Sequence, residues 1–107
     1  MDLEKLAENI GLEVEDFNEV FELYVETTSP DLEELKAALV KGDAQEVHKT
    51  AHSIKGSSGN LGLDELYELA GEIDDHARKQ SLDGLEDIVR VFSEKYQELV
   101  EDFKRSR

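Results

Sequence analysis

Apolar residues recur at intervals of three and four along almost the whole chain, which is the spacing of one face of an α-helix. The pattern predicts a short helix over about 2–10 and longer helices over about 13–41, 43–60, 63–80 and 83–104. Within 13–41, Ser29 can act as an N-cap with Pro30 at the first helical position, so we expect that helix to be kinked or broken near residue 30. No segment shows the strict alternation that indicates a β-strand.

The connections between the four long helices are short, and short connections make consecutive helices antiparallel neighbours. We therefore predict an all-α fold, an antiparallel up-down-up-down four-helix bundle with a short N-terminal helix. The 107 residues are enough for one hydrophobic core, so residues 1–107 should form a single domain.

Charge and composition exclude several classes of function. The formal net charge is −15, from 27 acidic and 12 basic residues, and this field repels nucleic acid and anionic lipid. The chain has no cysteine, which excludes disulfides, thiolate zinc sites and a cysteine nucleophile. The N-terminal sequence resembles neither a signal peptide nor a membrane span. We expect a cytoplasmic monomer that binds neither nucleic acid nor membrane.

One stretch departs from this acidic character. Residues 47–63 contain no Asp or Glu, whereas random placement at this acidic content would put roughly four there. The same stretch contains the segment AHSIKGSSGNLG, residues 51–62, with one histidine, one lysine and three glycines. An acid-free surface of this kind favours an anion or an acidic partner.

A helical wheel separates the two sides of the 43–60 helix. One narrow sector should face the core, and it contains Val47, Ala51, Ile54, Ser58 and Leu61. His52 lies about 140° from the centre of that sector and Gly56 about opposite it, so both should face water. Glycine in a helix costs roughly 0.5–1 kcal/mol relative to alanine. We therefore interpret Gly56 and Gly59 as clearance for a partner's backbone rather than as packing residues.

Lys55 follows His52 by three residues, so its ammonium can lie beside the imidazole on the same helix surface. Such a cation would neutralise an anion carried on the imidazole, which has an ordinary pKa near 6.5 and is largely neutral and nucleophilic in the cytoplasm. The predicted partner surface consists of Lys49, His52, Ser53, Lys55, Gly56, Gly59 and Asn60.

The run His-Ser-Ile-Lys-Gly-Ser-Ser-Gly-Asn-Leu-Gly, residues 52–62, resembles the signature of histidine-containing phosphotransfer (HPt) domains. The resemblance implies a phosphorelay carrier in two-component signalling, with partners that are response-regulator receiver domains, a hybrid sensor histidine kinase, or both. His52 would be the phosphoacceptor, Lys55 the neutralising neighbour, Gly56 the clearance for the receiver, and Gly62 the end of the helix. The carrier would not be an enzyme with its own ATP site, and would need no cofactor because the receiver supplies Mg²⁺.

The resemblance leaves one position open. Some HPt domains place a Gln on the following helix to hydrogen-bond the histidine, but the corresponding region here reads Glu72-Ile73-Asp74-Asp75-His76. Asp74 is close to that position and could orient a ring N–H. We expect His48 to be partly covered on the flank of its helix and His76 to lie on the surface.

Two alternatives use the same residues. His48 and His52 are four residues apart and could share a metal ion from one helix face, although the His-Glu-x-x-His pattern of hydrolases is absent and we predict no metal ligands. A structural helical adaptor would have the same core but would leave the glycines and the acid-free stretch unexplained. A P-loop lacks its Gly-Lys-Ser/Thr, and no base is placed to activate Ser53 or Ser57 for hydrolysis.

Overall fold

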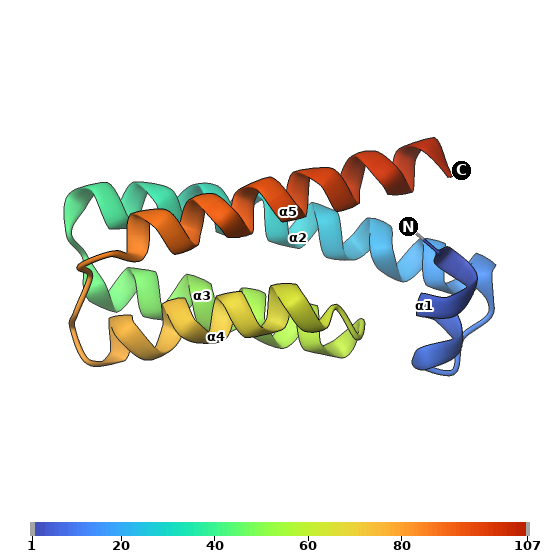
Figure 1. Cartoon of the computed structure of the whole chain (residues 1–107), viewed down its shortest axis with the longest axis horizontal. Coiled ribbons are helices and arrows are strands. Elements are labelled where there is room, and N and C mark those ends of the chain that lie inside the picture. The colour runs from blue at the N-terminus through green and yellow to red at the C-terminus, as the bar shows by residue number, and fades with distance from the viewer. Residues whose placement is uncertain (1, 107) are drawn as a thin grey trace.

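The computed structural model describes residues 2–106, and these form helices without β-strands. The helices are α1 (Leu3–Asn9), α2 (Val14–Lys41), α3 (Ala44–Asn60), α4 (Asp64–Arg78) and α5 (Leu85–Arg105) (Figure 1). The long helices α2 to α5 alternate in direction along a bundle of 40 × 22 × 18 Å, and α1 lies at one end beside the start of α2 (Figure 1). The prediction of an all-α up-down-up-down bundle is confirmed.

The core lies between the four long helices. The five positions of α3 that the wheel turned inward are all buried, at 3% exposure or less. Aromatic side chains fill the space between α2 and α5, where the rings of Phe21 and Phe103 lie 4.3 Å apart between centroids. α3 packs against both α2 and α4. One face of α3 is therefore buried in the core, and its opposite face is exposed to solvent.

Of the two alternatives expected near residue 30, a kink or a break, the break is wrong. α2 continues from Val14 to Lys41 with Pro30 inside it. Ser29 does not cap a new helix, because its hydroxyl instead hydrogen-bonds the Tyr96 hydroxyl of α5 at 2.7 Å. Thr28 and Leu32 are buried on either side of the exposed proline. Packing of the flanking turns therefore holds α2 together where the proline cannot donate a backbone hydrogen bond.

Both ends of α3 are capped by its own sequence. At the start, the Asp43 carboxylate accepts a hydrogen bond from the Glu46 backbone N–H at 3.1 Å, as an N-cap residue does. At the end, Leu63 N donates to Ser58 O at 3.0 Å and Gly62 N donates to Gly59 O at 3.1 Å, with Gly62 in the left-handed region at φ 69°. This Schellman motif ends the helix, and it places the α3–α4 turn against Ile10 at the end of α1.

Candidate functional site

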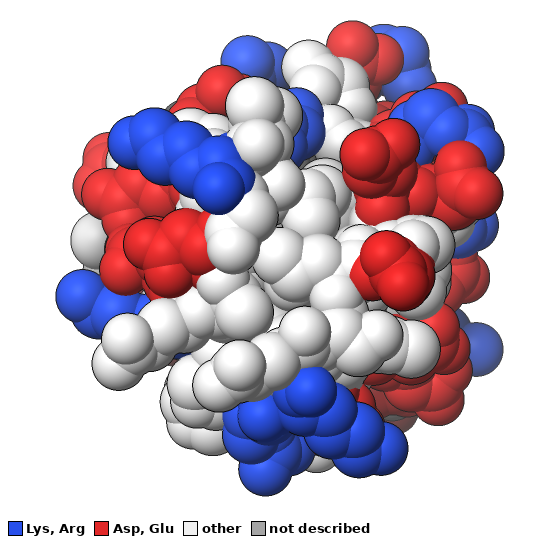
Figure 2. All heavy atoms as spheres, turned by 90° about the vertical axis from the view of Figure 1, so that its left-hand side faces the viewer, with Lys and Arg blue, Asp and Glu red and all other residues white. Residues whose placement is uncertain are grey.

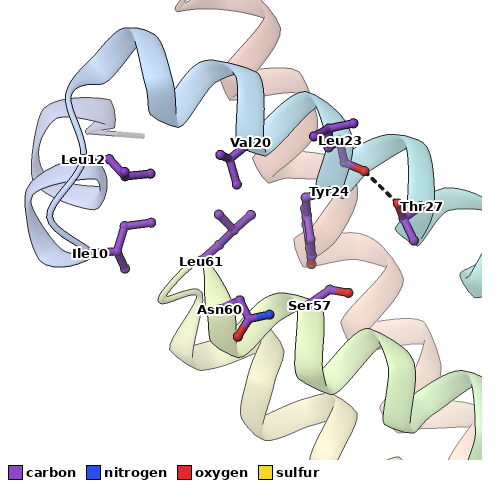
Figure 3. Close-up of a pocket in the computed structure, with 9 residues that line it drawn as sticks. All are labelled: Ile10, Leu12, Val20, Leu23, Tyr24, Thr27, Ser57, Asn60 and Leu61. Atoms are coloured by element: carbon purple, nitrogen blue, oxygen red, sulfur yellow. Dashed lines mark hydrogen bonds between the residues drawn. The ribbon is translucent and has the colours of Figure 1, made fainter.

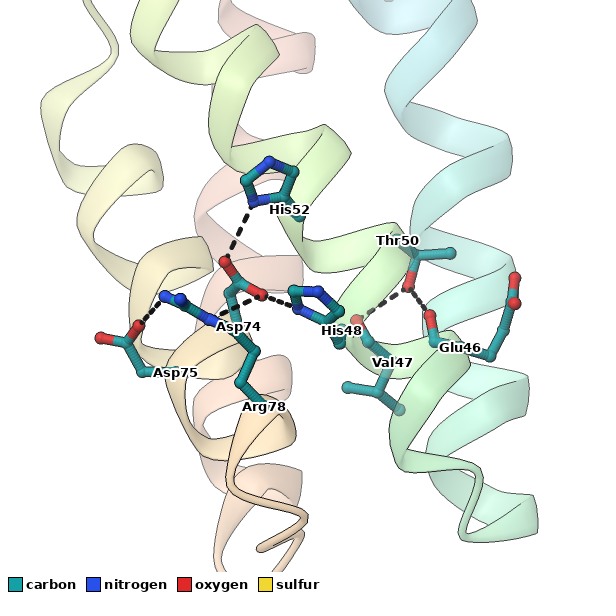
Figure 4. A network of polar contacts seen from close by, with 8 residues as sticks. All are labelled: Glu46, Val47, His48, Thr50, His52, Asp74, Asp75 and Arg78. Atoms are coloured by element: carbon teal, nitrogen blue, oxygen red, sulfur yellow. Dashed lines mark hydrogen bonds and ion pairs between the residues drawn. The ribbon is translucent and has the colours of Figure 1, made fainter.

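His52 stands out from the middle of α3 over a buried carboxylate of α4. Its side chain is 70% exposed, while the Asp74 side chain below it is 0% exposed. His52 Nδ1 lies 3.2 Å from Asp74 Oδ2 (Figure 4). An ionised carboxylate can only accept hydrogen bonds, so His52 Nδ1 carries the proton of this contact. In the neutral ring, Nε2 is then the basic and nucleophilic nitrogen.

A second histidine shares the same carboxylate. His48 lies one turn before His52 on α3, and its Nδ1 hydrogen-bonds Asp74 Oδ1 (Figure 4). Its side chain is 37% exposed, in agreement with the expected flank position. Arg78 lies one turn after Asp74 on α4, with its Nε 3.9 Å from Oδ1, and its Nη2 donates to Asp75 Oδ1 at 2.7 Å. Asp74 is therefore surrounded by three basic side chains on two helices.

These neighbours keep Asp74 ionised. Burial by itself raises the pKa of the Asp74 carboxyl, but hydrogen bonds from His48 and His52, with the charges of His48 and Arg78, outweigh burial and hold the pKa below its ordinary value. The carboxylate consequently stays an acceptor throughout the neutral range. It can both fix the His52 ring and balance positive charge that develops on it.

Lys55 leans onto α4. Its ammonium lies 5.4 Å from the centroid of the Tyr67 ring, a cation–π geometry. The end of its alkyl chain passes over Gly71, whose missing Cβ would lie 3.7 Å from Lys55 Cε. From the sequence we expected this ammonium beside His52, and in the structure its described contact is with the Tyr67 ring.

The two outward glycines of α3 have different surroundings. A Cβ on Gly56 would meet nothing within 4 Å, which agrees with clearance. A Cβ on Gly59 would lie 3.2 Å from Tyr67 Cδ1. The expectation that Gly59 meets no packing need is therefore wrong, because its missing side chain makes room for the ring that carries Lys55.

The remaining residues of the expected partner surface divide between solvent and α2. Lys49 and Asn60 are exposed. Ser53 is also exposed, but its hydroxyl donates a hydrogen bond to Asp31 Oδ2 of α2 at 3.1 Å. The acid-free stretch thus receives acidic neighbours from other helices, Asp31 on one side and Asp74 on the other.

Comparison with known proteins identifies the family. Residues 19–104 match the model of the Hpt domain. The chain belongs to the Hpt domain family. This Hpt domain is therefore a phosphotransfer carrier of the phosphorelay type. The exposed His52 over the Asp74 carboxylate agrees with that role. The metal-binding and adaptor alternatives are not favoured.

Two relatives support the assignment. The crystal structure of histidine-containing phosphotransfer protein B (HptB) from Pseudomonas aeruginosa PAO1 is similar with a TM-score of 0.83 and 28% identity, covering 94% of this Hpt domain and 88% of that chain. The chemotaxis protein CheA of Rhizobium meliloti (strain 1021) is 32% identical over 71% of this chain, and the matched region is only 12% of CheA. The similarity thus concerns the Hpt domain and a small part of the larger protein.

An apolar groove runs beside the second half of α3 (Figure 3). Ile10 and Leu12 close one end, and α2 and α3 form the walls (Figure 3). Leu23 on the α2 wall is 61% exposed. The groove contains Asn60 and Ser57 on its α3 side, so one residue of the expected partner surface borders an apolar depression that the sequence analysis did not identify.

Two structural features are absent from residues 2–106. Within them no group of three or more His, Cys, Asp and Glu side chains is arranged to hold a metal ion. The Nδ1 atoms of both His48 and His52 are already directed at Asp74. Over the same residues, each helix is too short or too polar to cross a membrane.

Proposed function

We propose that His52 Nε2 carries the phosphoryl group of this Hpt domain. In the forward step, the Nε2 lone pair attacks the phosphorus of an aspartyl phosphate on a receiver domain. The N–P bond forms as the P–O bond to the aspartate breaks, and the receiver carboxylate leaves with the bonding electrons. Reversal of the same step on a second receiver would return His52 to its free state.

The observation that carries this proposal is the contact of the exposed His52 with the buried Asp74. Because His52 Nδ1 keeps its proton while Nε2 bonds to phosphorus, the ring gains a positive charge during transfer. The Asp74 carboxylate, 3.2 Å from Nδ1, lies where that charge develops. Preorganised charge of this kind stabilises a transition state without reorganisation at the moment of reaction.

The surroundings of His52 suit a protein partner. Gly56 offers open space one turn after the histidine. The apolar groove lined by Leu23 and Asn60 lies further along the same helix and would hold an apolar side chain of a docked receiver (Figure 3). We propose that the partners are receiver domains, a hybrid sensor kinase or both, and that Lys55 swings from Tyr67 toward the phosphoryl group.

The proposal assigns the remaining chemistry to the partner. The receiver would contribute Mg²⁺ and its acidic ligands, and this Hpt domain would contribute neither an ATP site nor a cofactor. We further propose that it acts as a monomer in the cytoplasm, where response regulators would be its partners.

Incubation with a panel of phosphorylated receivers tests the proposal. We expect wild-type protein to acquire acid-labile, base-stable phosphate and His52→Gln to acquire none. His76→Ala serves as the control, because it removes an exposed histidine of α4 that is not a partner of Asp74. Label that persists in His52→Gln would place the phosphoryl group elsewhere, and a wild type that no receiver labels would contradict the carrier mechanism.

A further inference from the structure

His48 takes no direct part in the proposed phosphoryl transfer at His52. Its Nδ1 contacts Asp74 Oδ1 while His52 Nδ1 contacts Asp74 Oδ2, so each histidine holds one oxygen of a single carboxylate (Figure 4). The two rings are 5.9 Å apart between centroids and do not hydrogen-bond one another. The hydrogen-bonded connection between His48 and His52 therefore runs through Asp74.

The burial of Asp74 gives that connection its force. The side chain is fully buried, so water cannot replace a lost donor, and an unpaired buried carboxylate oxygen is costly. Arg78 is a poor substitute, because its Nε is 3.9 Å from Oδ1 and its Nη2 is engaged with Asp75 at 2.7 Å. His48 is thus the main hydrogen-bond donor to Oδ1.

Without the hydrogen bond from His48, rotation of the Asp74 carboxylate toward another donor would be favourable. Rotation about the Cβ–Cγ bond that turns the carboxylate toward Arg78 would weaken the contact of Oδ2 with His52 Nδ1. The His52 ring would then lose the partner that fixes its tautomer, since the protonated nitrogen of a histidine is set by the hydrogen bond it makes.

We propose that His48 is a positioning residue for phosphoryl transfer, which holds the Asp74 carboxylate so that Oδ2 keeps the Nδ1–H tautomer of His52. The inference rests on the proposed role of His52. It assigns His48 no contact with the phosphoryl group or with the receiver. Loss of His48 should therefore lower the rate of transfer within the complex and leave the affinity for the receiver unchanged.

Two substitutions separate the hydrogen bond of His48 from its bulk. His48→Leu keeps much of the side-chain volume and removes the donor. His48→Asn places an amide N–H close to the position of Nδ1 and should retain the contact with Oδ1. His76→Ala again controls for the loss of a histidine.

The first measurement is single-turnover transfer from a phosphorylated receiver over a range of receiver concentrations. For His48→Leu we expect the maximal rate to fall roughly 10-fold, less than the roughly 100-fold that a 1 Å misplacement of a reacting group can cost. The receiver concentration at half-maximal rate should not change. His48→Asn should recover most of the wild-type rate, and His76→Ala should match wild type.

The second measurement is the tautomer of His52, read from its ¹⁵N ring resonances in the unphosphorylated protein. Wild type and His48→Asn should show the proton on Nδ1, and His48→Leu should show a mixture of the two tautomers. This reading does not depend on a receiver and is made at a temperature where circular dichroism shows each variant folded. It therefore decides the proposal even if His48→Leu is too unstable for the transfer assay.

The outcomes are distinct from those that test the function. Wild-type transfer rates in His48→Leu, or an unchanged His52 tautomer, would overturn the positioning role while His52 remained the phosphoacceptor. A fall in rate that arises only from weaker receiver binding would also overturn it. Label retained in His52→Gln would instead remove the proposed function itself.

Discussion

At the scale of single residues, Gly56 and Gly59 show that two glycines of one motif can have different physical causes. Both face away from the core of the bundle on α3. Gly56 borders open space, whereas Gly59 gives room to the Tyr67 ring. The first glycine keeps a surface low, and the second lets an aromatic ring of α4 lie close to α3.

This difference predicts opposite consequences of adding one methyl group. Gly56→Ala should raise the free energy of unfolding by about 0.5–1 kcal/mol, because alanine restricts the unfolded chain and clashes with nothing. Gly59→Ala should gain less than this or destabilise the protein, because its Cβ would lie 3.2 Å from Tyr67 Cδ1. Urea unfolding of both variants measures the two effects. Equal gains would show that Tyr67 yields freely.

The other residues of α3 show how much of the site could be predicted from the sequence. The apolar period of α3 placed His52 outward and Ser58 inward, because it depends only on the 3.6-residue repeat of the helix. The contacts of Ser53 with Asp31 and of Lys55 with Tyr67 depend on the axial register between helices. Sequence periodicity does not specify that register. The proximity of Asp74 to His52 could be suggested only from the HPt resemblance, and its sharing with His48 had no signal in the sequence.

At the scale of the elements, α2 shows tertiary contacts overriding a local signal. Ser29-Pro30 is a good helix start in isolation, yet both residues lie inside one helix of 28 residues. Buried side chains lie before and after the proline, and the Tyr96 hydroxyl hydrogen-bonds the Ser29 hydroxyl. The sequence predicted the five segments well because apolar spacing dominates them. It could not exclude a break at residue 30, because the contacts with α5 are not local.

The proline should therefore still reduce the stability of α2. Pro30→Ala restores a backbone N–H and removes the steric conflict with the preceding turn, and we expect it to raise the free energy of unfolding by about 1–3 kcal/mol. Thermal and urea unfolding followed by circular dichroism measure this change. If Pro30→Ala changed the free energy of unfolding by less than about 0.5 kcal/mol, as most substitutions at exposed positions do, α2 would have relaxed around the proline already.

At the scale of the whole molecule, negative charge exceeds positive charge, but the two signs are mixed on the surface. At the end of the bundle that contains the α2–α3 and α4–α5 connections, Lys and Arg side chains lie among Asp and Glu around an uncharged centre (Figure 2). The net charge of −15 nevertheless opposes compactness at neutral pH. Stability should therefore respond to pH through the total charge and through Asp74 in opposite directions.

Between pH 7 and the isoelectric point of about 4.4, proton uptake reduces the net charge, so the free energy of unfolding should rise. Asp74 acts at lower pH, because its folded pKa is held below the ordinary value. Its stabilisation is complete above an unfolded pKa of about 3.9 and is lost as pH falls through the lowered folded pKa.

Urea unfolding of wild type and Asp74→Asn across this range separates the two contributions. The difference in stability between them should shrink as the pH falls below roughly 4, because Asp74 then takes up a proton. A difference that grows as the pH falls below roughly 4 would contradict the assigned direction of the Asp74 pKa.

The contrast in exposure between His52 and Asp74 has a consequence for signalling. A docking protein can cover the outer edge of the His52 ring, but it cannot touch the carboxylate that holds the inner edge. The tautomer of the His52 imidazole therefore does not depend on which partner protein is docked. If receiver domains are the partners, as proposed, each would meet a His52 of the same intrinsic reactivity, and differences in transfer rate between them would arise in the receivers.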